Sequence, residues 1–203
     1  MVSKLTFTKY DLPQIDRKEV LRYMGAATAD DATAELINEC EKECEDCFSY
    51  LVCFDVFNIK TTDKTVDFSA FSVQSGDLAK NLSGCNTAVI FAATVGPQID
   101  RLIKKYSSIS PAKALCLQAF GNERIEALCD AFNKQITECQ AAEGHATRPR
   151  FSAGYGDFEL SCQRDIFKVL CCEKQIGVTL NDSLLMTPQK SVTAVIGIKE
   201  GAK

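Results

Sequence analysis

The sequence has no tryptophan and only one histidine, His145. A Ser-His-Asp triad would therefore have to use His145, and a zinc site built from several histidines is impossible. No apolar run approaches the roughly 18 residues of a membrane-spanning helix, so we expect no membrane association. Lysine and arginine are scattered, and the net charge is −4, which argues against a nucleic-acid partner.

Cysteine, by contrast, is abundant, with 11 residues in the chain. The N-terminus becomes charged too early for a secretory signal. An odd number of cysteines without such a signal argues against a disulfide framework and for reduced thiols in the cytoplasm. We therefore expect a cytoplasmic protein whose cysteines act mainly as small buried apolar residues.

The spacing of apolar residues predicts the elements of one domain, residues 1–203. Helices are expected at 16–25, 28–51, 76–82, 97–106, 111–142 and 161–177. Strands are expected at 51–59, 66–73 and 87–96, with two or three short ones within 178–198. Because helices and strands are interspersed without strict βαβ alternation, we predict an α+β fold with a mainly antiparallel sheet flanked by helices, one of them long. Gly121 within the long helix indicates close backbone packing.

Cys40, Cys44 and Cys47 have the spacing C-x3-C-x2-C, which is known from iron–sulfur clusters that cleave S-adenosylmethionine into a radical. Such a cluster needs three thiolates that converge from a flexible loop within a barrel-like scaffold. Here the cysteines fall on one face of a predicted helix, spread over about 10 Å at 1.5 Å per residue. We interpret them as core residues and expect no metal site.

The loop RPRFSAGYGDFEL, residues 148–160, breaks all periodicity. The guanidinium of Arg150 suits a carboxylate, glycines let the backbone approach a ligand, and Tyr155 offers a flat face for a base or a cation. Gly154-x-Gly156 lacks the third glycine of a dinucleotide fingerprint. On this chemistry alone, a structural Ω-loop is the preferred interpretation.

Three stretches nevertheless resemble the activation domain of cobalamin-dependent methionine synthase, in a short stand-alone form. They are RFSAGYGDFEL, QRDIFKVL and IGVTLNDSLLMTPQKSVTAVIG. Shorter similarities extend the resemblance over nearly the whole chain, in ATVGPQID, AFGNERIEALCD and DRKEVLRYMG. The resemblance implies the fold of that domain and an extended groove that binds S-adenosylmethionine.

The resemblance also assigns site residues. Arg150 matches the arginine that holds the methionine carboxylate, Tyr155 matches an adjoining aromatic residue, and Glu126 matches an acidic position less securely. The backbone that reads the adenosine corresponds to Phe151, Ser152, Ala153 and Gly154. The sequence departs from the large enzyme in its last strand, where Val195-Ile196 replaces a Trp-Tyr pair.

The resemblance further implies a role in the reductive methylation, or reactivation, of the corrinoid of a separate methionine synthase. The expected partners are its corrinoid-binding modules and an electron donor such as flavodoxin or ferredoxin. Cobalamin would stay on the partner, because the motif Asp-x-His-x-x-Gly cannot be built around His145. We expect no catalytic residue, since the task is positioning. Three alternatives remain open: a non-catalytic S-adenosylmethionine sensor, an assembly subunit of a corrinoid methyltransferase, and a structural cysteine-rich protein.

Overall fold

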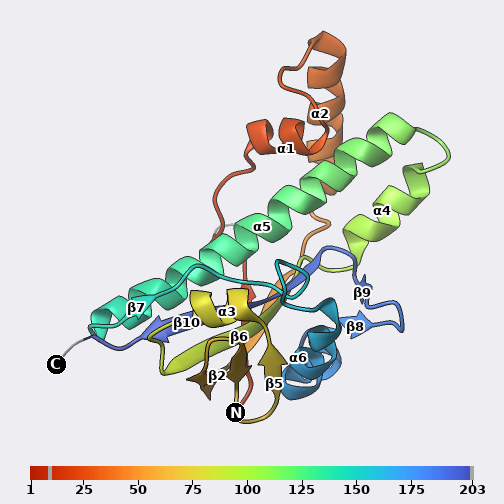
Figure 1. Ribbon diagram of the computed structural model, residues 1–203. Coiled ribbons are helices and arrows are strands. Elements are labelled where there is room, and N and C mark those ends of the chain that lie inside the picture. The colour runs from red at the N-terminus through yellow and green to blue at the C-terminus, as the bar shows by residue number, and fades with distance from the viewer. Residues whose placement is uncertain (9–10, 202–203) are drawn as a thin grey trace.

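The computed structural model describes residues 1–8 and 11–201, and its centre is a five-stranded sheet (Figure 1). In spatial order the strands are β1 (Ser3–Phe7), β2 (Tyr50–Asn58), β6 (Thr87–Thr94), β10 (Ser191–Lys199) and β7 (Ala146–Thr147). Every neighbouring pair in this sheet is antiparallel. The predicted antiparallel sheet is therefore confirmed.

Seven α-helices and one 3₁₀ helix, η1 (Leu160–Cys162), occur in the described chain. The α-helices are α1 (Arg17–Tyr23), α2 (Asp31–Cys44), α3 (Gly76–Asn81), α4 (Gln98–Tyr106), α5 (Pro111–Ala142), α6 (Gln163–Leu170) and α7 (Cys172–Ile176). Short strands form two small sheets, one of β3 (Lys60–Thr61), β4 (Thr65–Asp67) and β5 (Ser72–Gln74), the other of β8 (Thr179–Leu180) and β9 (Met186–Thr187). The long helix α5 has the predicted bounds.

The two faces of the sheet support two hydrophobic cores. Alternate residues of β6 point to opposite faces, so Phe91 packs toward α5 while Ile90 packs toward α3, α6 and α7. The ring of Phe91 lies 4.9 Å from the ring of Phe132 on α5. Helix α5 crosses the sheet and extends beyond it, where α1, α2 and α4 pack along its other half (Figure 1).

Close packing explains the glycine within α5. A Cβ atom at Gly121 would come within 2.9 Å of Cε of Lys190, whose stem is buried against the helix. The Nζ atom of Lys190 donates to the side-chain oxygens of Gln118, at 2.5 Å, and Asn122, at 2.8 Å. The turn before β10 is thereby attached to α5, as the glycine predicted.

Three predicted elements were wrong in their extent. The helix predicted for 28–51 ends at Cys44, so Cys47 lies in the connection to β2 and not on the helix. The strand predicted for 66–73 is a β4–β5 hairpin, in whose turn Ser69 has a φ of 66°. The helix predicted for 161–177 is broken at Cys171, which has a φ of 50° and lets Cys172 face the core.

Three strands were missed: β1 and the two-residue strands β3 and β7. In β1, the alternation of Leu5 and Phe7 with polar residues is typical of a half-buried strand, but the run is short. Its partner β2 fixes it, with Leu5 opposite Val52.

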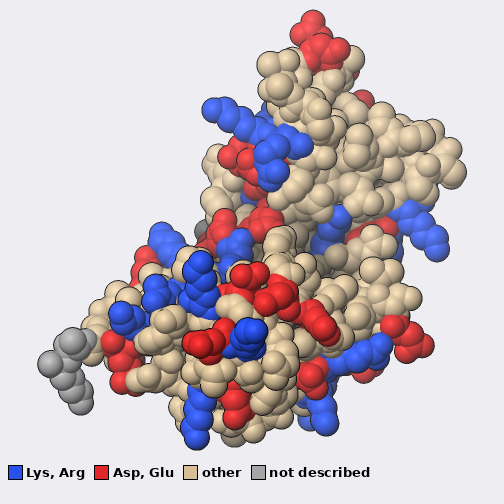
Figure 2. Space-filling model, in the orientation of Figure 1, with Lys and Arg blue, Asp and Glu red and all other residues tan. Residues whose placement is uncertain are grey.

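Within residues 1–8 and 11–201, no helix combines the length and apolar character needed to cross a membrane. On the face drawn in Figure 2, basic and acidic side chains are interspersed, consistent with a net charge of only −4.

Candidate functional site

A groove of about 350 Å³ lies where the loop 148–159 leaves the edge of β10. The loop is attached to that strand through Phe151 and Val195, whose amides and carbonyls form two hydrogen bonds of 2.9 Å. The groove is lined by Glu126, Arg150, Phe151, Ser152, Ala153, Tyr155, Gln163, Met186, Ser191, Val192 and Thr193. It therefore brings together six of the seven predicted site residues; Gly154 is not among those that line it.

Arg150 is held in the groove by two carboxylates of α5. Its Nη2 atom donates to Oε2 of Glu126 at 2.7 Å, and its Nη1 atom donates to Oδ1 of Asp130, one helical turn further on. Burial alone would lower the pKa of Arg150. The hydrogen bond to Asp130 and the negative charges of Asp130 and Glu126 outweigh this effect, so the pKa of Arg150 is raised. The guanidinium is thus permanently charged, oriented, and still 26 % exposed to a ligand.

Arg148, two residues earlier, has a different environment. Its Nη2 atom donates to the carbonyl oxygen of Ser83 at 2.8 Å, and its stem lies against Gly197. Alternate residues of an extended segment point to opposite sides, which explains why only Arg150 reaches the groove.

In the backbone of the loop, the amides of Ser152 and Ala153 are available to a ligand, whereas the two that follow them are already bonded. The amide of Gly154 donates to the carbonyl of Phe158 at 2.7 Å, and the amide of Tyr155 donates to that of Ser152 at 3.3 Å. No residue in the described part of the chain accepts a hydrogen bond from the amide of Ser152 or Ala153. Gly154, with a φ of +97°, shapes the turn.

Asp157 anchors the loop, a role that the sequence analysis missed. Its carboxylate accepts hydrogen bonds from the hydroxyl of Ser75, the amide of Gly76 at 2.7 Å and the amide of Asp77 at 3.1 Å, at the N-terminus of α3. The hydrogen bond from Ser75, followed by those from the two amides, lowers the pKa of this carboxyl. A Cβ atom at Gly156, which has a φ of +55°, would collide with the carboxylate of Asp77.

The far side of the groove comes from residues that the sequence analysis did not assign. Gln163 begins α6, Met186 begins β9, and Ser191, Val192 and Thr193 begin β10. All lie in stretches that carried the resemblance, but no local pattern marks them as binding residues. Tyr155, 68 % exposed, stands at the rim.

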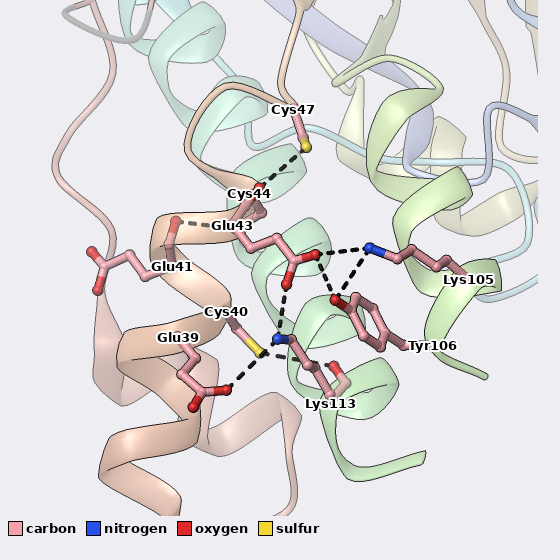
Figure 3. A network of polar contacts seen from close by, with 9 residues as sticks. All are labelled: Glu39, Cys40, Glu41, Glu43, Cys44, Cys47, Lys105, Tyr106 and Lys113. Atoms are coloured by element: carbon pink, nitrogen blue, oxygen red, sulfur yellow. Dashed lines mark hydrogen bonds and ion pairs between the residues drawn. The ribbon is translucent and has the colours of Figure 1, made fainter. Parts of the chain in front are cut away.

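The three cysteines of the triplet do not line this groove; Figure 3 shows them in and just after α2. The thiols of Cys40, Cys44 and Cys47 donate to three different carbonyl oxygens, of Lys113, Glu41 and Glu43. Burial raises the pKa of Cys44 and of Cys47, which disfavours the thiolates that a cluster requires. Among residues 1–8 and 11–201, no three His, Cys, Asp or Glu side chains are arranged to hold a metal ion.

Comparison with known proteins gives two matches that bear on this groove. Residues 76–203, which include every residue of the groove, match the family described as vitamin B12 dependent methionine synthase, activation domain. No curated protein matches the chain. A solved structure, described as the crystal structure of the MetH reactivation domain bound to AdoHcy, superimposes with a TM-score of 0.68 at 14 % identity. The match covers 100 % of this chain and 80 % of that one, which confirms the predicted fold.

Proposed function

The chain belongs to the family of vitamin B12 dependent methionine synthase activation domains, and from that premise we propose that it binds S-adenosylmethionine in the groove of Arg150. We further propose that it supports reactivation of the corrinoid of a separate methionine synthase. The observation that carries the proposal is the groove itself, in which six residues assigned from the sequence meet along one edge of the sheet.

The charges at one end of the groove match the amino-acid half of this ligand. The methionine portion carries a carboxylate and an ammonium group on the same carbon atom. Arg150 can bind the carboxylate through two parallel hydrogen bonds, and Glu126 beside it can accept from the ammonium group. The ligand would then exchange partners with the Arg150–Glu126 ion pair, so no charge is left unpaired in the complex.

Methyl transfer requires positioning rather than acid–base chemistry. When bound by the partner, the reduced corrinoid would supply the nucleophile, and the electron that reduces it would come from a separate donor such as flavodoxin or ferredoxin. As the methyl group leaves, the bond electrons stay on sulfur, and S-adenosylhomocysteine remains in the groove. No proton moves in this step, so the residues of this chain need only hold the sulfonium in line and exclude other orientations.

The rim of the groove suits a partner that docks over it. Tyr155 is exposed there, and exposed Leu160 lies beside the turn at Gly154. Such apolar side chains at a groove mouth are typical of a surface covered by another protein. The described cysteines are all free, which supports our placement of the protein in the reducing cytoplasm.

Calorimetric titration with S-adenosylmethionine tests the proposal. Arg150→Ala should weaken binding by about 2–4 kcal/mol, because it leaves a buried carboxylate without its charged partner. Arg148→Ala is the matched control and should change the affinity far less, since Arg148 bonds to Ser83 on the other side of the segment. Equal losses in the two variants would contradict the assignment of Arg150, and absence of binding by the unmodified protein would contradict the proposed function.

A further inference from the structure

Two residues that line the groove each carry a buried side-chain atom that has no hydrogen-bond partner. These atoms are Oε1 of Gln163 and Oγ1 of Thr193, in residues that are only 5 % and 2 % exposed. Buried polar atoms are almost always paired, so an unpaired one calls for an explanation. Ser191, in the same groove, shows the usual situation: its hydroxyl oxygen lies within hydrogen-bond distance of Oγ1 of Thr94, at 2.9 Å, and of the carbonyl oxygen of Pro188, at 2.7 Å.

The main chain at Thr193 is also open toward the groove. Val195 exchanges hydrogen bonds with Phe151, and the carbonyl of Gly197 accepts from the amide of Arg148. Every second residue of a strand directs its N–H and C=O groups to the same edge, so those of Thr193 point to this edge as well. Strand β7 pairs only with Ile198 and Lys199, and within the described chain no strand covers β10 at Thr193.

The unpaired atoms and Arg150 lie on opposite sides of the edge of β10. Arg150 is bonded to α5, which covers one face of the sheet, whereas Gln163 begins α6, which covers the other. Successive residues of β10 point to opposite faces of the sheet. Val192 packs on the α5 side, so the side chain of Thr193 points to the α6 side. A ligand that places its carboxylate at Arg150 and fills the groove must therefore cross this edge toward Gln163 and Thr193.

We propose that Gln163 and Thr193 form a subsite for the nucleoside half of the ligand, a role that rests on the proposed function. The amide oxygen of Gln163 accepts a hydrogen bond from the nucleoside, whose donors are the amino group of the base and the hydroxyls of the ribose. Thr193 adds its hydroxyl and its free main-chain groups. The buried polar atoms are thus unpaired only until the ligand pairs them.

Stability and affinity measurements can distinguish a role of Gln163 and Thr193 in ligand binding from a role in stabilising the fold. Replacing an unpaired buried polar atom by an apolar group of similar shape removes a cost from the ligand-free protein. Gln163→Leu and Thr193→Val should therefore unfold at the same temperature as the unmodified protein or at a higher one. Their affinity for S-adenosylhomocysteine, measured by calorimetry, should fall about tenfold, because the bound nucleoside then loses a hydrogen bond in a buried site.

Thr61→Val is the matched control. Oγ1 of Thr61 is also buried and unpaired, but it lies on β3 outside the groove. This variant should keep both the unfolding temperature and the affinity for S-adenosylhomocysteine. A fall in the unfolding temperature of both Gln163→Leu and Thr193→Val with unchanged affinity would show that the two side chains serve the fold, and would overturn the inference.

Binding of a ligand fragment can show which half of the ligand Gln163 contacts. 5′-Methylthioadenosine keeps the nucleoside but has no carboxylate or ammonium group. Its affinity, measured by NMR titration, should fall in Gln163→Leu by the same factor as for the whole ligand, and should stay within about twofold in Arg150→Ala. Unchanged binding of the fragment by Gln163→Leu would overturn this inference and leave the proposed function intact. If the unmodified protein bound neither S-adenosylhomocysteine nor S-adenosylmethionine, both proposals would fall.

Discussion

Asp157 fixes the loop that carries Arg150 and Tyr155, although it does not itself line the groove. Its partners Ser75, Gly76 and Asp77 lie 80 to 82 positions earlier in the chain, so no local pattern could reveal the contact. The residue types of Arg150 and Tyr155 indicated what they could bind, but their chemistry alone favoured a structural loop, and only the family resemblance assigned them to a ligand site. What a residue can bind is readable from its type, whereas what holds it in place depends on distant segments.

Asp157→Asn should loosen this anchor and lower the affinity for S-adenosylmethionine several-fold. Asparagine keeps an acceptor but loses the negative charge that the N-terminus of α3 stabilises. The pKa of Asp157 is lowered from its ordinary value of 3.8 in the folded protein. The contribution of its carboxylate to holding the loop is therefore fully present above pH 3.8 and is lost as the pH falls through the lower folded pKa. Hydrogen exchange of the loop amides should accelerate in the variant at neutral pH.

Asp31→Asn provides the comparison for this experiment. Asp31 is also an acidic residue in the first turn of a helix, but it is exposed on α2 and does not line the groove. If both variants lowered the affinity for S-adenosylmethionine equally, the effect would come from net charge and not from the anchor.

Among the secondary-structure elements, length and periodicity were enough to predict α5 but not the ends of α2 or the break after α6. Helix α5 presents apolar residues over many turns, so its pattern is unambiguous. The apolar pattern of α2 continues past Cys44 through Cys47 and Phe48, yet the helix ends at Cys44, so the pattern alone did not mark its end. In the same way, Cys171 adopts a left-handed conformation that its residue type does not predict.

Glu43 is the main polar contact between α2 and its neighbours (Figure 3). Its carboxylate accepts hydrogen bonds from the hydroxyl of Tyr106 at 2.7 Å and from Nζ of Lys105 at 3.4 Å, and it pairs with Nζ of Lys113 at 2.8 Å. These partners come from α4 and α5, so one side chain connects three helices. The bond from Lys113 is the main cause of the lowered pKa of Glu43.

Glu43→Gln should reduce the free energy of unfolding at pH 7 by roughly 1 kcal/mol, a value kept small because the carboxylate is 27 % exposed and screened by solvent. A carboxyl with a lowered pKa stabilises the fold above its ordinary value of 4.5, and this contribution disappears as pH falls through the lower folded value. The difference between the variant and the unmodified protein, measured by urea unfolding, should therefore vanish in acid.

The control for this measurement is Glu39→Gln, one helical turn earlier. Glu39 is mostly exposed and lies 3.6 Å from Nζ of Lys113. It should contribute little at any pH. A difference between Glu43→Gln and the unmodified protein that persisted unchanged into acid would show that the loss does not come from the charge of Glu43.

At the scale of the whole molecule, residues 1–75 contribute strands β1 and β2 to the central sheet, whereas the family match covers only residues 76–203. The match begins at residue 76, but β6 is paired on one side with β2, which precedes that boundary, and β2 is paired with β1. Without β1 and β2, the central strand β6 would become an exposed edge, and both cores would lose the buried residues of β2. We therefore propose that residues 1–203 act as a single activation-like domain.

Under the proposed function, the corrinoid is held by another protein, and the one histidine of this sequence is not placed to ligate it at the groove. His145 lies just after α5, where its Nδ1 atom is 3.1 Å from Oε1 of Gln140, and it does not line the groove. On this proposal the partner also presents the same corrinoid to other substrates, so we expect the docking to be transient. An interface near or below about 1,200 Å² with micromolar affinity is expected for such an encounter.

Reactivation of an oxidised, inactive corrinoid methionine synthase should therefore require three components together: this protein, S-adenosylmethionine and a strong reductant. Arg150→Ala should abolish the rescue at low S-adenosylmethionine and restore part of it at high concentration, because the defect lies in ligand binding. Consumption of S-adenosylmethionine during the rescue separates an activator from a sensor or an assembly subunit, neither of which would demethylate it.

Two outcomes of this reactivation assay would contradict the proposed activator role. Rescue by reductant and S-adenosylmethionine without this protein would contradict a role in positioning the methyl group, since the reaction would then need no second protein. Failure with every corrinoid synthase of the same cell, by a protein that calorimetry shows to bind S-adenosylmethionine, would favour the sensor instead. Because binding and rescue are measured separately, the groove at Arg150 and the proposed partner are tested independently of each other.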